Sequence, residues 1–352
     1  MRGLTSFHPV EPAFFLEVVQ PLVSGSKIDP EPYLLRALQH RVGAWSTRQY
    51  IRTLDILLEE STPPPPPTTG SRWEKLRARL EVFDFRANPL ATLVKKAIHR
   101  DLHLLGRPFL IADGSPRAVA EVVQRYREAE TAGVIEQLVE DQLGQMSPAL
   151  AGKIQPDADS EMPPDGAYRT GLMEALREIH DLAQAARKGE FWNEGGANGR
   201  QPAVNFLPTY LPWRAAWLHS RILPFWLAED VDGLETICRA AGVTTPDCLV
   251  PAWVLFGDAC DEFPKVRQEL HHELTSSRGT GGYVSPEDVP ELVTFLKAHG
   301  GQIIQAATRE GEGPRCSVLL RKMRECATYA EKSGLGYLEA QGIEPLGPDP
   351  AC

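Results

Sequence analysis

Apolar positions recur at helical spacing through the first two thirds of the chain. Asp29 followed by Pro30 is typical of a helix start, and Leu34, Ala37 and Val42 continue one apolar face behind it. Ser115 with Pro116 indicates another start, and a long amphipathic segment runs from residue 168 to 188 before Gly189. The same reading gives further helices from residues 46, 71, 88 and 134. The pattern predicts a predominantly helical region.

The pattern changes after about residue 245. The run LVPAWVLFGD, residues 249–258, has the length and composition of a buried strand. A helix is expected from Ser285 to a stop at Gly300, a second strand over 301–308, a helix over 316–334 and a third strand over 335–343. Helices that alternate with short apolar strands predict a small mixed domain.

These patterns together predict an α+β protein, with a predominantly α-helical N-terminal two thirds and a smaller mixed α/β C-terminal domain. The expected division is a helical pair over 1–60, a proline-rich linker or loop over 61–70, a helical domain over 71–245 and the mixed domain over 246–352. The linker STPPPPPTTG contains five successive prolines, which lack amide donors and favour extended backbone.

The composition of the chain argues against some classes of binding partner. The chain has 37 Lys and Arg against 47 Asp and Glu, so its net charge of -10 repels a phosphate backbone and argues against nucleic acid. Neither an apolar segment long enough to span a membrane nor a targeting sequence is evident, so we expect a cytoplasmic protein that does not bind membranes. Abundant alanine, glycine and proline suggest a GC-rich bacterial source.

All six cysteines fall in the last third, and none has C-x-x-C spacing. We interpret them as reduced thiols, mostly in the core, and expect no cofactor.

The stretch NFLPTYLPWRAAWLHSRILPFWLAED, residues 205–230, is rich in aromatic residues and proline. Pro212 is expected to open a helix that stacks Trp213 and Trp217, and Pro224 to restart it as far as Gly242. The stretch is either core between the two regions or a binding surface, since Trp and Arg dominate binding energies. The candidate binding residues are Trp192, Trp213, Arg214, Trp217, Arg221 and Trp226.

Two further patterns suggest chemistry. His99 and His103 are spaced i, i+4, as two imidazoles that share a metal on a helix would be, but a third ligand is not evident. The loop SSRGTGG, Ser276 to Gly282, has the glycines to lay backbone amides around an anion, and the candidates are Arg278, Gly279, Gly281 and Gly282. The loop lacks the residue order of a P-loop or a dinucleotide-binding motif.

No complete catalytic motif emerges from the sequence. The leading hypothesis is therefore a non-catalytic protein-binding module of regulatory, adaptor or toxin-neutralising type, whose partner has a basic surface. One alternative is a metal-dependent or phosphate-substrate enzyme that uses His99 and His103 or the 276–282 loop. Another is a small-molecule sensor with an aromatic pocket.

Overall fold

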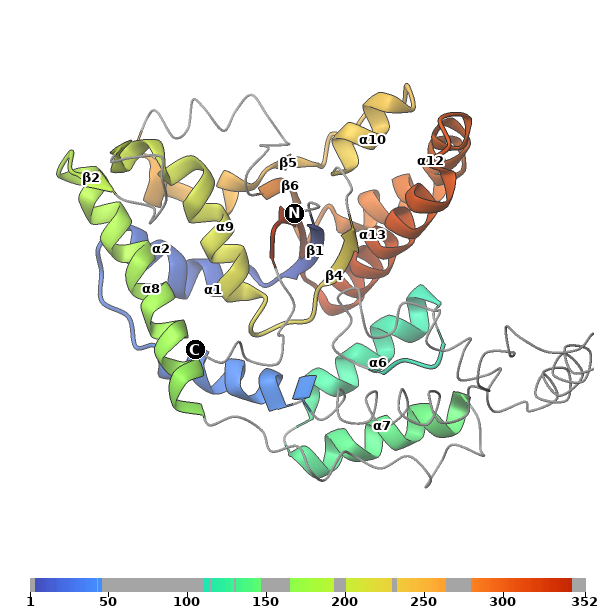
Figure 1. Ribbon diagram of the computed structural model, residues 1–352, viewed down its shortest axis with the longest axis horizontal. Helices are drawn as coiled ribbons and strands as arrows, with labels where there is room; N and C mark the ends of the chain where they lie inside the picture. The colour runs from blue at the N-terminus through green and yellow to red at the C-terminus, as the bar shows by residue number, and fades with distance from the viewer. Residues whose placement is uncertain are drawn as a thin grey trace, which may run out of the picture.

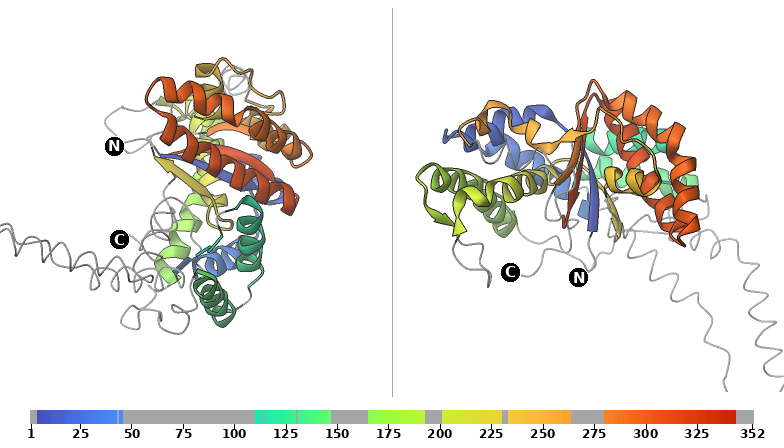
Figure 2. Two further views of the ribbon diagram at one scale, coloured as in Figure 1. Left: turned by 90° about the vertical axis from the view of Figure 1, so that its right-hand side faces the viewer. Right: turned by 90° about the horizontal axis from the view of Figure 1, so that it is seen from above.

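The computed structural model describes residues 4–42, 44–45, 110–113, 115–129, 131–146, 165–192, 201–229, 233–263 and 280–343. An antiparallel five-stranded sheet lies at the centre, with helices on both faces (Figures 1 and 2). Its order is β4-β1-β7-β6-β5. The strands are β1 (Leu4–Val10), β4 (Trp226–Glu229), β5 (Val250–Pro251), β6 (Thr280–Val284) and β7 (Gly336–Gln341). The predicted α+β class is confirmed.

Strand β1 lies inside the sheet, although the sequence did not predict it. It pairs with β7 from Thr5 opposite Gln341 to Val10 opposite Gly336, and with β4 on its other side. Residues 5–10 are all buried, because helices cover both faces of the sheet. Buried strands of this kind lack the alternation of polar and apolar residues by which a half-exposed strand is recognised.

One face of the sheet packs against two long helices, α12 (Val289–Arg309) and α13 (Gly313–Ser333). Helix α13 contacts β1, β4 and β7, and α6 (Pro116–Glu128) packs on its outer side. The short helix α10 (Leu234–Ala240) contacts α12, and α7 (Ala132–Met146) contacts α6. The right-hand view of Figure 2 shows α12 and α13 on one side of the sheet.

The opposite face packs against α9 (Leu207–His219), which contacts β6 and β7 and lies against α8 (Asp165–Arg187). The chain that leaves β1 turns through α1 (Pro12–Phe14), a π-helical turn (Phe15–Val19) and α2 (Gln20–Val23), and α2 packs on α8. Residues 31–42 then form another helix. Short 3-10 segments (Ala203–Asn205 and Ala252–Cys260) and the strand pair β2 (Phe191–Trp192) with β3 (Gln201–Pro202) complete the described elements.

Residues typical of helix starts and stops predicted several of the observed helix ends. The Ser115 side chain accepts the amide of Ala118, as an N-cap does, with Pro116 in the first turn. Helix α8 ends two residues before Gly189, and α13 ends at Gly334, both glycines having positive φ. The predicted helix behind Pro30 and the predicted strand near 335–343 are also confirmed.

Two predictions in the C-terminal third are wrong. The run 249–258 contributes only β5 to the sheet, because Pro251 lacks the amide that would extend the pairing, and a 3-10 segment follows. Gly300 does not end a helix: α12 continues to Arg309, so 301–308 is helix rather than strand. Gly300 is buried opposite Leu320 of α13, and packing between the two helices holds the glycine pair in helical form.

The aromatic stretch also differs from expectation. Helix α9 starts at Leu207 with Pro208 in its first turn, and Pro212 lies inside it. Beyond Pro224 the chain does not resume a helix but enters β4, and α10 forms only after Gly233. Residues 226–229 form a strand because they pair with β1, and the sequence of residues 224–242 alone gives no sign of this distant partner.

The expected helices from residues 46, 71 and 88 and the 61–70 linker lie outside the described residues. The domain division stays a prediction, although the sheet takes strands from both sides of residue 245.

Candidate functional site

Four of the six predicted binding residues lie together along α9 and just beyond it. The guanidinium of Arg214 lies 5.4 Å from the ring centre of Trp213 and 5.2 Å from that of Trp217. Arg221 lies 4.4 Å from the Trp217 ring. Both tryptophans are partly buried and pack against the core. The arrangement is a stack of alternating cations and rings.

This stack also joins two helices. Glu178 of α8 accepts hydrogen bonds from Arg214 and from the Tyr210 hydroxyl, the latter at 2.6 Å. Burial and the nearby Glu178 raise the pKa of Tyr210 to about 12. These contacts attach α9 to α8, so Tyr210 and Arg214 have a structural role.

The other two predicted residues lie elsewhere. Trp226, in β4, is 1% exposed, and its ring centre lies 5.9 Å from that of Tyr329 on α13. Trp192, in the short strand β2, is partly buried against the core. Trp226 is thus a core residue, while Trp192 is a peripheral one.

The predicted anion loop is only partly described. Gly281 and Gly282 belong to strand β6 rather than to a loop, and a Cβ on Gly282 would lie 2.4 Å from the Leu249 side chain. This close approach to Leu249 accounts for the glycine. Arg278, Gly279, His99 and His103 lie outside the described residues.

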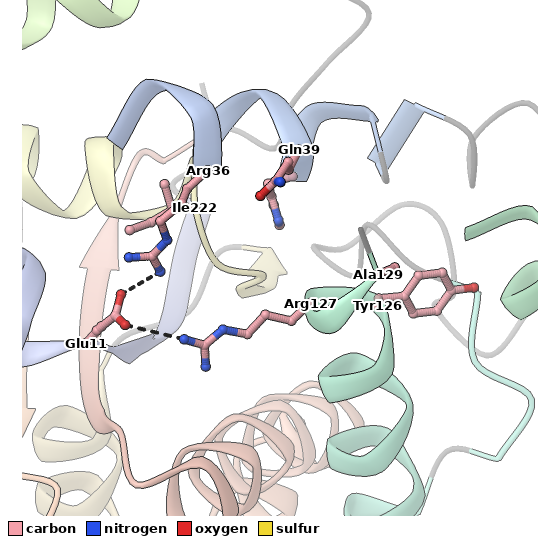
Figure 3. Close-up of a pocket in the computed structure, with 8 residues that line it drawn as sticks. Glu11, Arg36, Gln39, Tyr126, Arg127, Ala129 and Ile222 are labelled. Carbon is pink, nitrogen blue, oxygen red and sulfur yellow. Dashed lines mark hydrogen bonds and ion pairs between the residues drawn. The ribbon is translucent and has the colours of Figure 1, made fainter. Parts of the chain in front are cut away.

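A different set of residues forms a polar pocket between β1, the 31–42 helix and α6 (Figure 3). Glu11 follows β1 directly, Arg36 comes from the helix, and Arg127 comes from the last turn of α6. The carboxylate of Glu11 accepts from Arg36 Nη2 at 2.6 Å and from Arg127 Nη2 at 3.4 Å. The cavity measures about 160 Å³, and its described lining is Glu11, Arg36, Gln39, His40, Tyr126, Arg127, Ala129 and Ile222.

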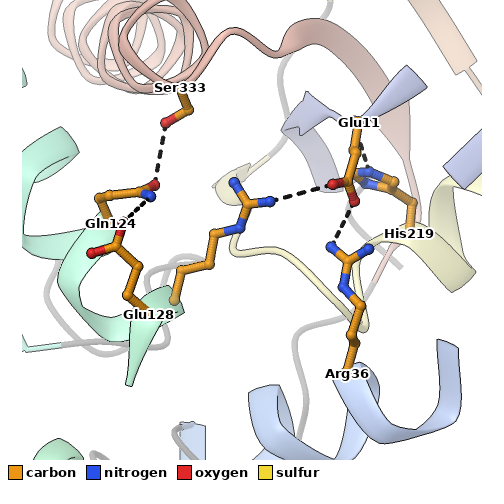
Figure 4. A network of polar contacts seen from close by, with 7 residues as sticks. Glu11, Arg36, Gln124, Glu128, His219 and Ser333 are labelled. Carbon is orange, nitrogen blue, oxygen red and sulfur yellow. Dashed lines mark hydrogen bonds and ion pairs between the residues drawn. The ribbon is translucent and has the colours of Figure 1, made fainter. Parts of the chain in front are cut away.

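The backbone at Glu11 is held from the opposite side. Its N–H donates to Nε2 of His219 at 3.1 Å, as Figure 4 shows. Nε2 is therefore the acceptor, and the ring proton lies on Nδ1. His219 is itself packed against Phe14 and Phe15. This hydrogen bond fixes the position from which the Glu11 side chain reaches the two arginines.

The described lining of the pocket has more positive than negative side chains, whereas the protein has a net charge of -10. Burial lowers the pKa of His219 well below its ordinary value, and His8, Arg36, Arg127 and His40 lower it further. The imidazole is therefore neutral, and the neighbouring cations set the local field. Two guanidinium groups face a single carboxylate here.

Contacts between helices position Arg127. In Figure 4 the Ser333 hydroxyl of α13 donates to Gln124 Oε1 at 3.5 Å, and Gln124 donates to Glu128 at 2.5 Å. These contacts attach the C-terminal part of α6 to α13. Arg127 and Arg36 are 26% and 40% exposed, so both remain accessible to solvent.

A second hollow, of about 280 Å³, lies between α10, α12 and α13. Its floor is mostly aliphatic and includes Ile237, Ile303 and Leu319, while Glu310, Glu312 and Arg315 stand at its edge. Arg315 lies 3.4 Å from Glu312, an exposed pair one helical turn apart.

The described thiols are unsuited to nucleophilic chemistry. Cys238, Cys248, Cys260, Cys316 and Cys326 form no disulfide with one another, and all five are buried, which confirms their predicted place in the core. Burial raises the pKa of each thiol, to about 12 for Cys238 and Cys260. Across the described ranges, no three His, Cys, Asp or Glu side chains form a group that could hold a metal ion.

Sequence reasoning missed the Glu11 pocket. Glu11, Arg36 and Arg127 are far apart in the sequence and belong to no motif. The pairing of β1 in the sheet and the packing of α6 on α13 bring these residues together.

No helix in the described part of the chain is both long and apolar enough to cross a membrane. Comparison with protein-family models, curated proteins and solved structures gives no match.

Proposed function

We propose that this protein is a non-catalytic binding protein, and that the pocket around Glu11 binds a small anionic ligand. The supporting observation is the convergence of Arg36 and Arg127 on one carboxylate at the pocket. Each guanidinium has five N–H donors in a planar fork. Arg36 gives one of them to Glu11, and Arg127 interacts with Glu11 and with the Tyr329 hydroxyl, so both retain donors for a further acceptor. This is the sensor class that the sequence left open, with a basic pocket in place of an aromatic one.

The composition of the pocket favours binding over catalysis. The described lining contains no serine, threonine, cysteine or lysine to act as a nucleophile. Glu11 is the carboxylate in this lining, and both of its oxygens accept from arginine. The lining does contain His40 and Tyr126, but the Tyr126 hydroxyl donates to the backbone oxygen of Leu110 at 3.4 Å. The groups that converge on one point in the pocket are the two guanidiniums and the carboxylate, which suits the holding of an anion.

Thermal unfolding in the presence of acetate, succinate or phosphate, at constant ionic strength, tests this proposal. A ligand at a hundred times its Kd stabilises the folded state by about 2.7 kcal/mol, which raises the Tm by several degrees. We expect at least one anion to raise the Tm of the wild type and Arg127→Gln to abolish the rise. Arg117→Gln is the matched control, because Arg117 lies on the same helix but pairs with Glu121 on the surface. The proposal fails if no anion raises the Tm, or if the control loses the effect as well.

Binding of a basic partner protein is the second candidate. The hollow between α10, α12 and α13 favours it, because an aliphatic floor edged by glutamates suits an apolar side chain flanked by basic residues. The net charge of -10 would speed association with such a partner and make it sensitive to salt.

Filling the hollow tests this candidate. Ala306 lines it, so Ala306→Trp should abolish capture of any partner recovered with the wild-type protein. Ala167→Trp is the control, since Ala167 is exposed on α8. A partner that binds both variants equally well does not use this hollow.

A further inference from the structure

The Glu11 carboxylate occupies the position in which an anionic ligand would meet both arginines. We infer that Glu11 is a built-in occupant of the pocket and that the ligand displacing it is a small phosphate monoester. This inference rests on the proposed function and adds to it the ligand class and a mechanism of exchange.

The geometry allows the side chain to leave while the backbone stays. The N–H of Glu11 is held by His219, and this bond involves no side-chain atom of Glu11. The side chain is 20% exposed and attached through three rotatable bonds, so rotation alone moves the carboxylate toward solvent. Strand β1 keeps its pairing with β7 in either state.

Charge distinguishes the candidate ligands. A monocarboxylate would replace one carboxylate by another, form no additional ion pair and lose its translational freedom, so it gains nothing over the tethered Glu11. A phosphate monoester carries nearly two negative charges at neutral pH and three acceptor oxygens. It satisfies the donor forks of both arginines more completely than one carboxylate does.

The size of the cavity agrees with a small phosphorylated group. With the Glu11 carboxylate in place the free volume is about 160 Å³, close to that of a cavity that holds one benzene molecule, so a phosphoryl group and a few further atoms fit in the pocket. Gln39 and His40 on the same wall supply further polar groups beside the two arginines.

Calorimetric titration of the wild type and Glu11→Gln with inorganic phosphate, methyl phosphate and acetate tests the inference. Wild type should bind both phosphates and not acetate. Loss of the competing carboxylate in Glu11→Gln should tighten phosphate binding about tenfold and make acetate binding measurable. Glu31→Gln is the matched control, because Glu31 pairs with Arg169 on the surface, away from the pocket. Its affinities should equal those of the wild type.

Other results of this titration would contradict the role of Glu11, the phosphate monoester or the binding of anions. Unchanged phosphate affinity in Glu11→Gln, or the same gain in Glu31→Gln, overturns the role of Glu11 while leaving anion binding intact. Binding of inorganic phosphate with rejection of methyl phosphate overturns the monoester. Absence of binding by every anion to both proteins overturns the proposed function and this inference together. If Glu11→Gln does not fold, Glu11→Asp keeps the charge on a shorter chain, and an affinity equal to wild type would contradict the inference.

Discussion

The carboxylate of Glu339 accepts the backbone N–H of Leu234 through both oxygens, at 3.2 and 3.1 Å. This contact joins β7 to the first residue of α10, and the Tyr337 hydroxyl donates to the same carboxylate at 3.1 Å. Glu339 is 2% exposed. Its burial raises the pKa to about 7, even though the hydrogen bonds from Leu234, Tyr337 and Gly282 lower it.

Glu339 should make stability depend on pH. Its pKa is raised from 4.5 to about 7, so between these values the folded state holds a proton that the unfolded state has lost. The stabilisation is complete below pH 4.5 and is lost as pH rises through 7. Glu339→Gln removes this titration. Relative to wild type, the variant should therefore gain roughly 3 kcal/mol between pH 4.5 and 7, at about 1.4 kcal/mol per unit.

Urea unfolding of both proteins at pH 4.5, 6 and 7.5 measures this change. Glu31→Gln serves as a control, because Glu31 is exposed. A difference between wild type and Glu339→Gln that is constant over this range would show that Glu339 does not titrate as expected.

Trp226 should matter more to stability than Trp213. Trp226 is fully enclosed between β1 and α13, and removal of a buried tryptophan side chain costs about 3–5 kcal/mol. Trp213 is only partly buried, so Trp213→Ala should cost less. Denaturant unfolding of the two variants measures both losses, and equal losses would contradict the assignment of Trp226 alone to the core.

Gly301 should tolerate, and benefit from, a methyl group. It lies inside α12, and a Cβ there would meet no atom within 4 Å. Gly301→Ala should stabilise the protein by about 0.5–1 kcal/mol, because alanine favours helix over glycine. Gly334→Ala should have the opposite effect, since Gly334 has φ of 64° at the end of α13. Thermal unfolding separates the two, and destabilisation by Gly301→Ala would argue against a continuous α12.

Several helix ends can be predicted from the residues within one helical turn of them. The Ser115 cap and the glycines 189 and 334 mark ends that depend on neighbouring residues alone. Strand β1 could not be predicted in the same way, because its partners β7 and β4 lie more than 200 residues away and both of its faces are buried. The helix expected beyond Pro224 was lost to the same pairing.

The candidate pocket depends still more on distant contacts. The aromatic residues of 205–230 are adjacent in the sequence, which is why they form a recognisable pattern, yet the most buried aromatic side chain among them, Trp226, belongs to the core. Glu11, Arg36 and Arg127 carry no shared spacing, and each alone is an ordinary surface-type residue. These three side chains lie close together because β1 is inside the sheet and α6 packs on α13.

The central claim is that Arg36 and Arg127 together bind an anion. Nuclear magnetic resonance of the arginine Nε–H groups during a titration with methyl phosphate tests it most directly. Signals of Arg36 and Arg127 should shift to saturation with one common Kd, while the Arg117 signal stays in place. Signals that shift alike for all three arginines without saturating, or that do not move at all, would contradict the claim.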